Sequence, residues 1–189
     1  MEGLPNNASV TAPPSTRTIA LVGLMGVGKS TIGRRLAQAL ELPFRDADQE
    51  IELAAGRTIP EIFAERGEAE FRAGERRVIG RMLQEPPHVL ATGGGAFMDD
   101  HTRTLMKEKA ITVWLKADLD VLVRRVGRKT TRPLLIGKDP RQVLQALMQT
   151  RYPVYAEADI TIETDDRPAS AAVNAILGAL GRRVEPAEV

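Results

Sequence analysis

Short runs of apolar residues rich in valine and isoleucine recur along the chain, separated by stretches in which apolar residues return every three or four positions. The runs cover residues 18–22, 88–91, 111–115 and 160–162. Each is short and continuous, as in strands that are buried on both faces. A fifth strand is predicted at residues 44–47, where the apolar content is lower.

The stretches between these runs predict helices. One apolar face runs through residues 29–40, a second pattern covers residues 51–55, and a third follows Asp118. Strands that alternate with helices form a parallel sheet, because each parallel pair needs a crossover and each crossover covers one face of the sheet. The sequence therefore predicts an α/β fold in three layers.

Two segments interrupt this alternation. Residues 59–83 predict a long helical insertion, which we expect to cover a pocket. Residues 124–138 are rich in lysine and arginine, and Gly127, Pro133 and Gly137 interrupt any regular element there. We interpret the second segment as a mobile basic loop.

Length and composition bound the class of protein. A chain of 189 residues, 43% of them hydrophobic, is long enough for one domain with its own core. We expect that domain over residues 17–182, between a flexible, proline-containing tail at 1–16 and a short polar tail at 183–189. The formal charge is +1, so no excess of positive charge favours a nucleic-acid partner.

Several classes of site and location are excluded or disfavoured. The chain has no cysteine, so disulfides, thiolate metal sites and cysteine nucleophiles are excluded. Its apolar runs are far shorter than the roughly 20 residues that cross a membrane, and no signal peptide precedes them. We therefore expect a cytoplasmic protein without a membrane partner.

The two histidines and the tryptophan do not indicate a further site. His88 and His101 lack partners at zinc-ligand spacing, so we predict surface or capping roles for them. For Trp114 we predict a core position.

The first candidate site follows the strand at 18–22. Residues 23–30 read Gly-Leu-Met-Gly-Val-Gly-Lys-Ser, which fits G-x-x-x-x-G-K-[ST] between a strand and a helix. Glycines let the backbone N–H groups and the helix N-terminus face an anion, while Lys29 reaches phosphates and Ser30 is available to Mg²⁺. An ordinary glycine turn is the alternative, but the strand and helix context favours a nucleotide site.

Two carboxylates, Asp46 and Asp48, lie at the end of the predicted strand 44–47, the second one residue beyond it. If the strand continues through both, their side chains point to the same side and converge on the nucleotide site, where one carboxylate serves Mg²⁺ and the other accepts a proton. Alternatively, both residues belong to the start of the next helix, where aspartate is a favoured cap. The pattern alone leaves these two interpretations even.

The strand ending at Ala91 is followed by Thr92 and the glycine triplet 93–95. Exposed backbone at the carboxyl end of a central parallel strand lies where open α/β sheets bind ligands, so we favour a binding loop over an ordinary one. Arg72, Arg132 and Arg151 are unremarkable as single surface charges; they gain weight only together.

The ordered motifs GLMGVGKST, FRDAD, EFRAGE, TGGG, RPLL and RYPVY resemble those of the shikimate kinases, small P-loop enzymes of aromatic biosynthesis. The resemblance covers about residues 17–168. It implies a five-stranded parallel sheet flanked by helices, with a substrate-binding helical segment at about 48–85 and a mobile lid at about 124–138. It also implies transfer of a phosphoryl group from ATP to the 3-hydroxyl of shikimate.

The resemblance assigns roles residue by residue. Asp48 binds the substrate hydroxyls and either serves as the base or helps to position it. Glu75 braces Arg72 as its ion-pair partner. A carboxylate with three hydroxyls suits arginine forks and an aspartate. The implied substrate-binding residues are Asp48, Arg72, Gly93, Gly94, Gly95 and Arg151.

For the nucleotide, the resemblance implies Mg²⁺ as cofactor, held by Ser30 and, through water, by Asp46. The lid residue Arg132 neutralises charge on the phosphates, together with Lys29. Arg125 contacts adenine, although Arg128 competes for this role, and Arg167 and Pro168 form an adenine loop. The implied ATP-binding residues are Gly26, Val27, Gly28, Lys29, Ser30, Thr31, Arg125, Arg132, Arg167 and Pro168.

Two rival functions stay open at this stage. A kinase for another small metabolite, such as gluconate, shares the P-loop but need not combine Arg72, Gly94 and Arg151. A nucleotide sensor shares the fold without catalysis, which the presence of Lys29, Asp48 and Arg132 disfavours. We expect ATP and shikimate as the ligands of a monomer.

Overall fold

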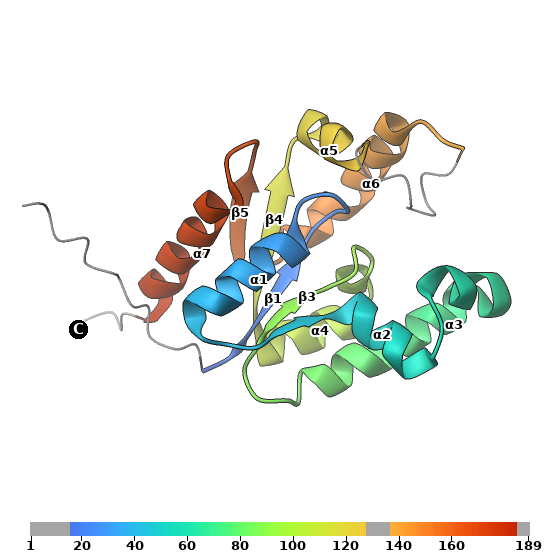
Figure 1. Cartoon of the computed structure of the whole chain (residues 1–189), viewed down its shortest axis with the longest axis horizontal. Helices are drawn as coiled ribbons and strands as arrows, with labels where there is room; N and C mark the ends of the chain where they lie inside the picture. The colour runs from blue at the N-terminus through green and yellow to red at the C-terminus, as the bar shows by residue number, and fades with distance from the viewer. Residues whose placement is uncertain (1–15, 128–136, 185–189) are drawn as a thin grey trace, which may run out of the picture.

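The computed structural model describes residues 16–127 and 137–184. Figure 1 shows a central sheet between layers of helices, with α2 and α3 projecting to one side. The elements in chain order are β1 (Thr18–Val22), α1 (Lys29–Leu40), β2 (Phe44–Asp46), α2 (Ala47–Ala55), α3 (Ile59–Met82), β3 (Val89–Ala91), the 3₁₀ helix η1 (Ala96–Met98), α4 (Asp100–Lys109), β4 (Ala110–Ala117), α5 (Leu119–Val126), α6 (Pro140–Tyr155), β5 (Ile160–Thr164) and α7 (Ala169–Val184).

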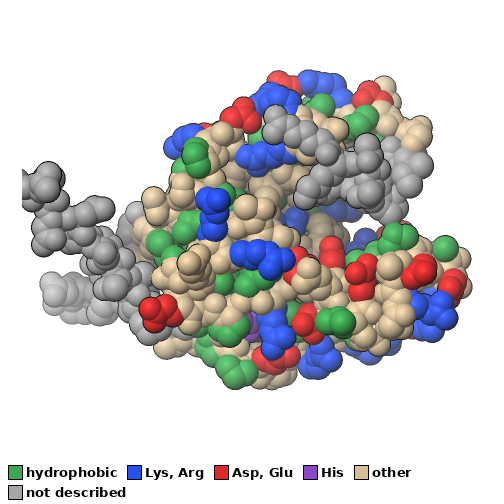
Figure 2. Space-filling model, in the orientation of Figure 1, with side chains coloured by type: hydrophobic (Ala, Val, Ile, Leu, Met, Phe, Trp, Pro, Cys, Tyr) green, Lys and Arg blue, Asp and Glu red, His purple; other side chains and the backbone are tan. Residues whose placement is uncertain are grey.

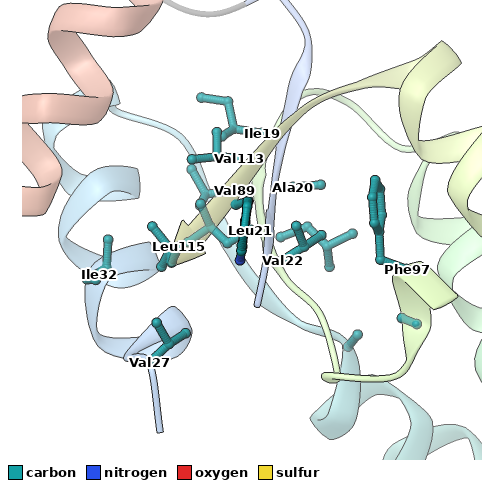
Figure 3. Close-up of a cluster of buried hydrophobic side chains, with 14 of the residues drawn as sticks. Ile19, Ala20, Leu21, Val22, Val27, Ile32, Val89, Phe97, Val113 and Leu115 are labelled. Atoms are coloured by element: carbon teal, nitrogen blue, oxygen red, sulfur yellow. The ribbon is translucent and has the colours of Figure 1, made fainter. Parts of the chain in front are cut away.

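The five strands form one parallel sheet in the order β2-β3-β1-β4-β5. All five predicted strands are therefore present, and the α/β prediction is confirmed. β1 is central and every one of its residues is buried. Its side chains alternate between the two faces, with Leu21 on the side of Ile32 and Val22 on the side of Phe97 (Figure 3).

Helices cover both faces of the sheet. On one face α1 packs against α7, and on the other α4 packs against β4 while η1 contacts α6 (Figure 1). Phe97 of η1 is fully buried, as is Leu36 of α1. The three predicted layers are thus observed, and each layer contributes side chains to one continuous core.

The helical insertion predicted at 59–83 is α3. A capping box starts it: the Thr58 hydroxyl accepts from the N–H of Glu61, and the Glu61 carboxylate accepts from the N–H of Thr58. At Gly67 the backbone leaves the helical region, with φ 77° and ψ 174°, so α3 consists of two pieces. Phe71 lies in the second piece and is buried.

Some predicted boundaries and positions are wrong. β2 ends at Asp46 and α2 begins at Ala47, so the predicted strand 44–47 is one residue too long. His88 is buried rather than on the surface: its ring contacts the Thr18 hydroxyl and the Pro86 carbonyl. Trp114 is in the core, as predicted.

The two tails and the lid fall only partly within the structure. Residues 1–15, 128–136 and 185–189 lie outside the described residues. Within the described ranges, no helix combines the length and apolar content that a membrane span requires. Acidic and basic side chains are interspersed over the visible face (Figure 2), in keeping with the nearly balanced charge.

The contact between α1 and β2 allows a test of the packing. A Cβ atom on Gly33 would lie 2.6 Å from the Phe44 ring and 3.2 Å from Leu21. We predict that Gly33→Ala lowers the free energy of unfolding by about 1–3 kcal/mol, because overpacking outweighs the gain in helix propensity. Gly181→Ala in α7, whose new Cβ meets no atom of the described part of the chain within 4 Å, is expected to raise it by about 0.5–1 kcal/mol. Urea denaturation measures both, and a destabilised G181A or a stabilised G33A would contradict the prediction.

Candidate active site

The loop between β1 and α1 is shaped by glycines. Gly23, Gly26 and Gly28 have positive φ angles of 144°, 82° and 101°, a region that side chains disfavour. A Cβ atom on Gly23 would lie 2.6 Å from the Leu115 carbonyl oxygen of β4. The loop therefore packs closely against the sheet and leads directly into α1, whose N-cap is Gly28. This is the strand, glycine loop and helix arrangement that the P-loop motif predicts.

Lys29, the first residue of α1, turns back over this loop. Its Nζ donates to the carbonyl oxygens of Gly23 at 2.7 Å and Leu24 at 3.0 Å. The ammonium group therefore lies beside the loop backbone, where the positive end of the α1 dipole also points. This arrangement concentrates positive potential where phosphates would sit.

Asp46 connects the glycine loop with α2. Its Oδ2 accepts from the Ser30 hydroxyl at 2.8 Å, and its Oδ1 accepts from the Asp48 N–H at 3.1 Å. Asp46 is thus the N-cap of α2, and Asp48 lies in the first turn. The interpretation based on a continuing strand is wrong because the chain turns into a helix at Ala47. The two carboxylates nevertheless line the same cavity.

The environment of Asp48 disfavours its charged form. Protein atoms around the carboxyl group displace water and raise its pKa, and the negative charge of Asp46 raises it further. Lys29 and Arg72 act in the opposite direction, but the net direction is upward. The carboxyl group is therefore a better proton acceptor than an ordinary aspartate.

The glycine triplet lies among three candidate site side chains, and each glycine makes room for one of them. A Cβ atom on Gly93 would lie 2.9 Å from Asp48 Oδ1. The same atom on Gly94 would lie 3.1 Å from Arg151 Nη1, and on Gly95 it would lie 2.4 Å from Arg72 Nη1. The loop thus brings Asp48, Arg72 and Arg151 together from three helices, α2, α3 and α6.

Arg72 is held by two carboxylates of its own helix. Its Nη1 donates to Glu75 Oε2 at 2.7 Å, and its Nη2 lies 3.4 Å from Glu68 Oε1. Glu75 is only 3% exposed, and burial raises its pKa although Arg72 lowers it. The second oxygen of Glu75 is buried and has no hydrogen-bond partner among the residues that the structure describes. It would be 3.0 Å from a Cβ atom on Gly93. The predicted bracing of Arg72 by Glu75 is present in the structure.

A cavity of about 550 Å³ joins the P-loop to the ends of β2, β3 and β5. Most of the predicted ligand residues line it. They are Gly26, Val27, Gly28, Lys29, Ser30, Thr31, Asp46, Asp48, Gly93, Gly94, Arg125, Arg167 and Pro168. Arg72, Gly95 and Arg151 do not line it but adjoin it through the glycine triplet. Arg132 and Arg128 lie outside the described residues.

Arg125 and Arg167 lie at the end of the cavity formed by α5 and the segment after β5. Arg125 Nη1 donates to the Val27 carbonyl at 3.0 Å, and its Nη2 donates to the Asp165 carbonyl. Arg167 Nε donates to the Asp165 carboxylate at 2.7 Å. Arg125 therefore ties the P-loop to the loop between β5 and α7, which contains Arg167 and Pro168.

Several residues at the site were not predicted from the sequence. The segment Glu163–Asp165 lines the cavity because β5 ends at the same edge of the sheet as β1; the parallel order was the signal that indicated it. The sequence indicates Tyr155 only as part of the RYPVY motif, without a role of its own. Its buried hydroxyl donates to the Gly94 carbonyl, a contact that no local pattern reveals.

The residues present fit a magnesium ion that is shared with a nucleotide. Within residues 16–127 and 137–184, no group of three or more acidic or histidine side chains forms a complete metal cage. The Ser30 hydroxyl and the Asp46 carboxylate lie 2.8 Å apart at the cavity wall. Mg²⁺ commonly takes one or two protein oxygens and completes its shell with water and phosphate oxygens.

Known proteins resemble the chain over most of its length. The family model for shikimate kinase matches residues 25–181. A shikimate kinase from Caulobacter vibrioides is 65% identical over 169 residues, which cover 89% of this chain and 84% of that relative. One from Zymomonas mobilis is 55% identical, covering 89% and 96%.

Solved structures agree in fold. A shikimate kinase from Acinetobacter baumannii in complex with shikimate has a TM-score of 0.85 and 38% identity, covering 91% of this chain and 97% of that one. A gluconokinase from Sinorhizobium meliloti has a TM-score of 0.63 at 21% identity, so it shares the fold alone. The P-loop, the carboxylates and the glycine triplet thus occur in a chain that belongs to the shikimate kinase family.

Proposed function

We propose that this protein transfers the γ-phosphoryl group of ATP to the 3-hydroxyl of shikimate, giving shikimate 3-phosphate and ADP in aromatic biosynthesis. The observation that carries the proposal is the glycine triplet. It brings Asp48 and two arginines together beside a P-loop cavity. A phosphate cradle beside a site for a small hydroxy acid is the arrangement that such a transfer requires.

ATP is held mainly by the P-loop. The N–H groups of residues 26–31 and the N-terminus of α1 bind the phosphates, and Lys29 adds a positive charge. The adenine lies toward Arg125, Arg167 and Pro168. Arg132, in the proposed lid, binds the phosphates. Either Arg125 or Arg128 contacts the adenine.

Ser30 and Asp46 are the residues that would hold Mg²⁺. When bound, the ion neutralises charge on the phosphate oxygens. The Ser30 hydroxyl donates to Asp46, and Asp46 also caps α2. Both side chains are therefore held by contacts within the protein.

Shikimate is recognised by charge and by hydrogen bonds. Arg72 and Arg151 bind its carboxylate, and Asp48 binds its hydroxyls, while the backbone of residues 93–95 approaches the ring. Glu75 fixes the guanidinium of Arg72 from a buried position. Two arginines beside the triplet, one next to Gly94 and one next to Gly95, give the carboxylate one preferred orientation.

The transfer then needs one proton acceptor. The 3-hydroxyl oxygen forms a bond to the γ-phosphorus, the bond from that phosphorus to the oxygen bridging the β- and γ-phosphates breaks, and the hydroxyl proton moves to the Asp48 carboxylate. The raised pKa of Asp48 favours this acceptance. A closing lid would exclude water, so that ATP is not hydrolysed.

We also propose that residues 17–182 act as a single domain, in a monomer, with residues 48–85 serving the substrate and 124–138 the lid. ATP and a free metabolite as substrates support a place in the cytoplasm. The proposal includes no nucleic-acid or membrane partner.

The direct test is ADP release with ATP and Mg²⁺ in the presence of shikimate, gluconate or a nucleoside monophosphate. We expect stimulation by shikimate alone. Stimulation by gluconate instead would make the protein a kinase for another metabolite. If no acceptor stimulates release although ATP binds, the protein is a nucleotide sensor rather than a kinase.

Replacing the proposed base tests the catalytic role of Asp48. Asp48→Asn is predicted to lower kcat by 10²-fold or more, because a positioned base is lost. The folded state should be at least as stable as wild type at neutral pH, because the substitution removes a carboxylate whose charged form the fold disfavours. Steady-state kinetics and thermal unfolding measure both effects. Asp100→Asn, on the exposed start of α4, is the control, and near-normal turnover of D48N would remove Asp48 from the mechanism.

The raised pKa of Asp48 also predicts the pH profile. Protonation removes the acceptor, so kcat/KM should fall as the pH drops through the Asp48 pKa, which lies above its ordinary value of 3.8. The effect of this group on stability has the opposite sign. Because the folded state binds this proton more tightly than the unfolded state does, the free energy of unfolding rises as the pH falls through the same range. A profile whose acid limb lies at or below 3.8 would show that another group is titrating.

Arg72 is predicted to serve shikimate rather than ATP. Arg72→Ala should raise the KM for shikimate roughly 10- to 100-fold, because a charged hydrogen bond to the carboxylate is lost, and should leave the KM for ATP within about twofold. Arg77→Ala is the matched control, since Arg77 lies on the same helix with a weak and exposed ion pair. Equal losses for both substrates would contradict the assignment.

A further inference from the structure

Tyr155 is the last residue of α6 and is fully buried beneath the glycine triplet. Its ring belongs to an aromatic cluster, with ring centres 6.0 Å from Trp114, 6.4 Å from Tyr152 and 6.5 Å from Phe97. Its hydroxyl donates to the carbonyl oxygen of Gly94, 61 positions away in sequence. The packed ring therefore fixes where this hydroxyl can reach.

Arg151 lies one helical turn earlier on α6, and its positive charge acts on the same hydroxyl. Because the hydroxyl proton goes to Gly94, the lone pairs of the oxygen remain available to the guanidinium, which only donates. The guanidinium also adjoins the loop that the hydroxyl holds, since a Cβ atom on Gly94 would lie 3.1 Å from Arg151 Nη1. The Tyr155 hydroxyl, the Gly94 backbone and the Arg151 guanidinium thus lie next to one another.

Ionisation does not remove the bond to Gly94 near neutral pH. Burial raises the pKa of Tyr155, although the positive charge of Arg151 lowers it, and the net direction is upward from 10.0. The hydroxyl accordingly keeps the proton that it donates to Gly94.

We infer that Tyr155 is a positioning residue for the acceptor substrate, acting through Arg151 and the Gly94 carbonyl. It sets the direction of the Arg151 guanidinium relative to the glycine triplet before shikimate binds. The inference rests on the proposed function, because it takes Arg151 as a ligand of the shikimate carboxylate. A side chain oriented in advance loses less conformational freedom on binding, so the effect falls on shikimate affinity.

The chain supplies a matched control. It has only two tyrosines, and the other, Tyr152, also donates its hydroxyl to a backbone carbonyl, that of Ala117 at 2.6 Å. Tyr155→Phe and Tyr152→Phe each delete one such bond from the same helix and the same aromatic cluster. A purely structural role predicts similar effects for the two variants, whereas positioning predicts an effect on shikimate for Y155F alone.

We expect Y155F to raise the KM for shikimate roughly five- to tenfold, the scale of one buried hydrogen bond, with the KM for ATP unchanged within about twofold. Y152F should leave both KM values near wild type while losing a comparable increment of melting temperature. In an Arg151→Ala background, Y155F should add no further increase in the KM for shikimate, because the residue through which it acts is gone. Y155F is also made with Gly181→Ala, which supplies folded protein if the single variant unfolds.

Three results would overturn the inference. An unchanged KM for shikimate in Y155F would show that Arg151 is oriented without the hydroxyl. Equal rises in Y155F and Y152F, or an additive rise in the R151A background, would reduce Tyr155 to a packing residue. If instead the wild-type enzyme does not use shikimate, the proposed function fails, and this inference falls with it. Wild-type turnover therefore separates the two failures.

Discussion

β1 is hydrogen-bonded to a parallel neighbour on each side, β3 and β4, and the whole site depends on this pairing. Parallel strands all end at the same edge of a sheet. The loops after β1, β3 and β5 and the start of α2 after β2 therefore converge on one cavity. The lining residues come from several loops and helices, so the geometry of the site follows from the order of the strands.

Within that frame, absent side chains matter as much as present ones. Asp48, Arg72 and Arg151 approach the triplet at positions where any larger residue would collide with them. Gly23 allows the P-loop a similar closeness to β4. The site is therefore compact, because at these glycines only backbone occupies the space that a side chain would otherwise fill. Two carboxylates at its rim hold polar side chains in place. The buried Glu75 accepts from Arg72, and Asp46 accepts from Ser30.

Much of this arrangement was accessible from sequence, for identifiable reasons. The strands were predicted because both faces of the sheet are buried, which makes their apolar runs continuous. The P-loop was predicted because its spacing requires a strand before it and a helix after it. Asp46 and Asp48 were ambiguous because aspartate suits both a ligand and a helix cap, and Asp46 has the capping contact while lining the cavity. The burial of His88 and the contact of Tyr155 were not predicted because they depend on residues far away in the chain, Thr18 and Gly94.

The aromatic cluster under the triplet has an optical consequence. The chain has one tryptophan and two tyrosines, and these three rings contact one another, with the Trp114 centre 4.9 Å from Tyr152 and 6.0 Å from Tyr155. Excitation of either tyrosine can therefore pass to Trp114 over a short distance. The near-ultraviolet absorption and emission of the whole protein come mainly from one spot, directly beneath Gly94 and Arg151. The molecule thus has a spectroscopic reporter at its acceptor site without any added label.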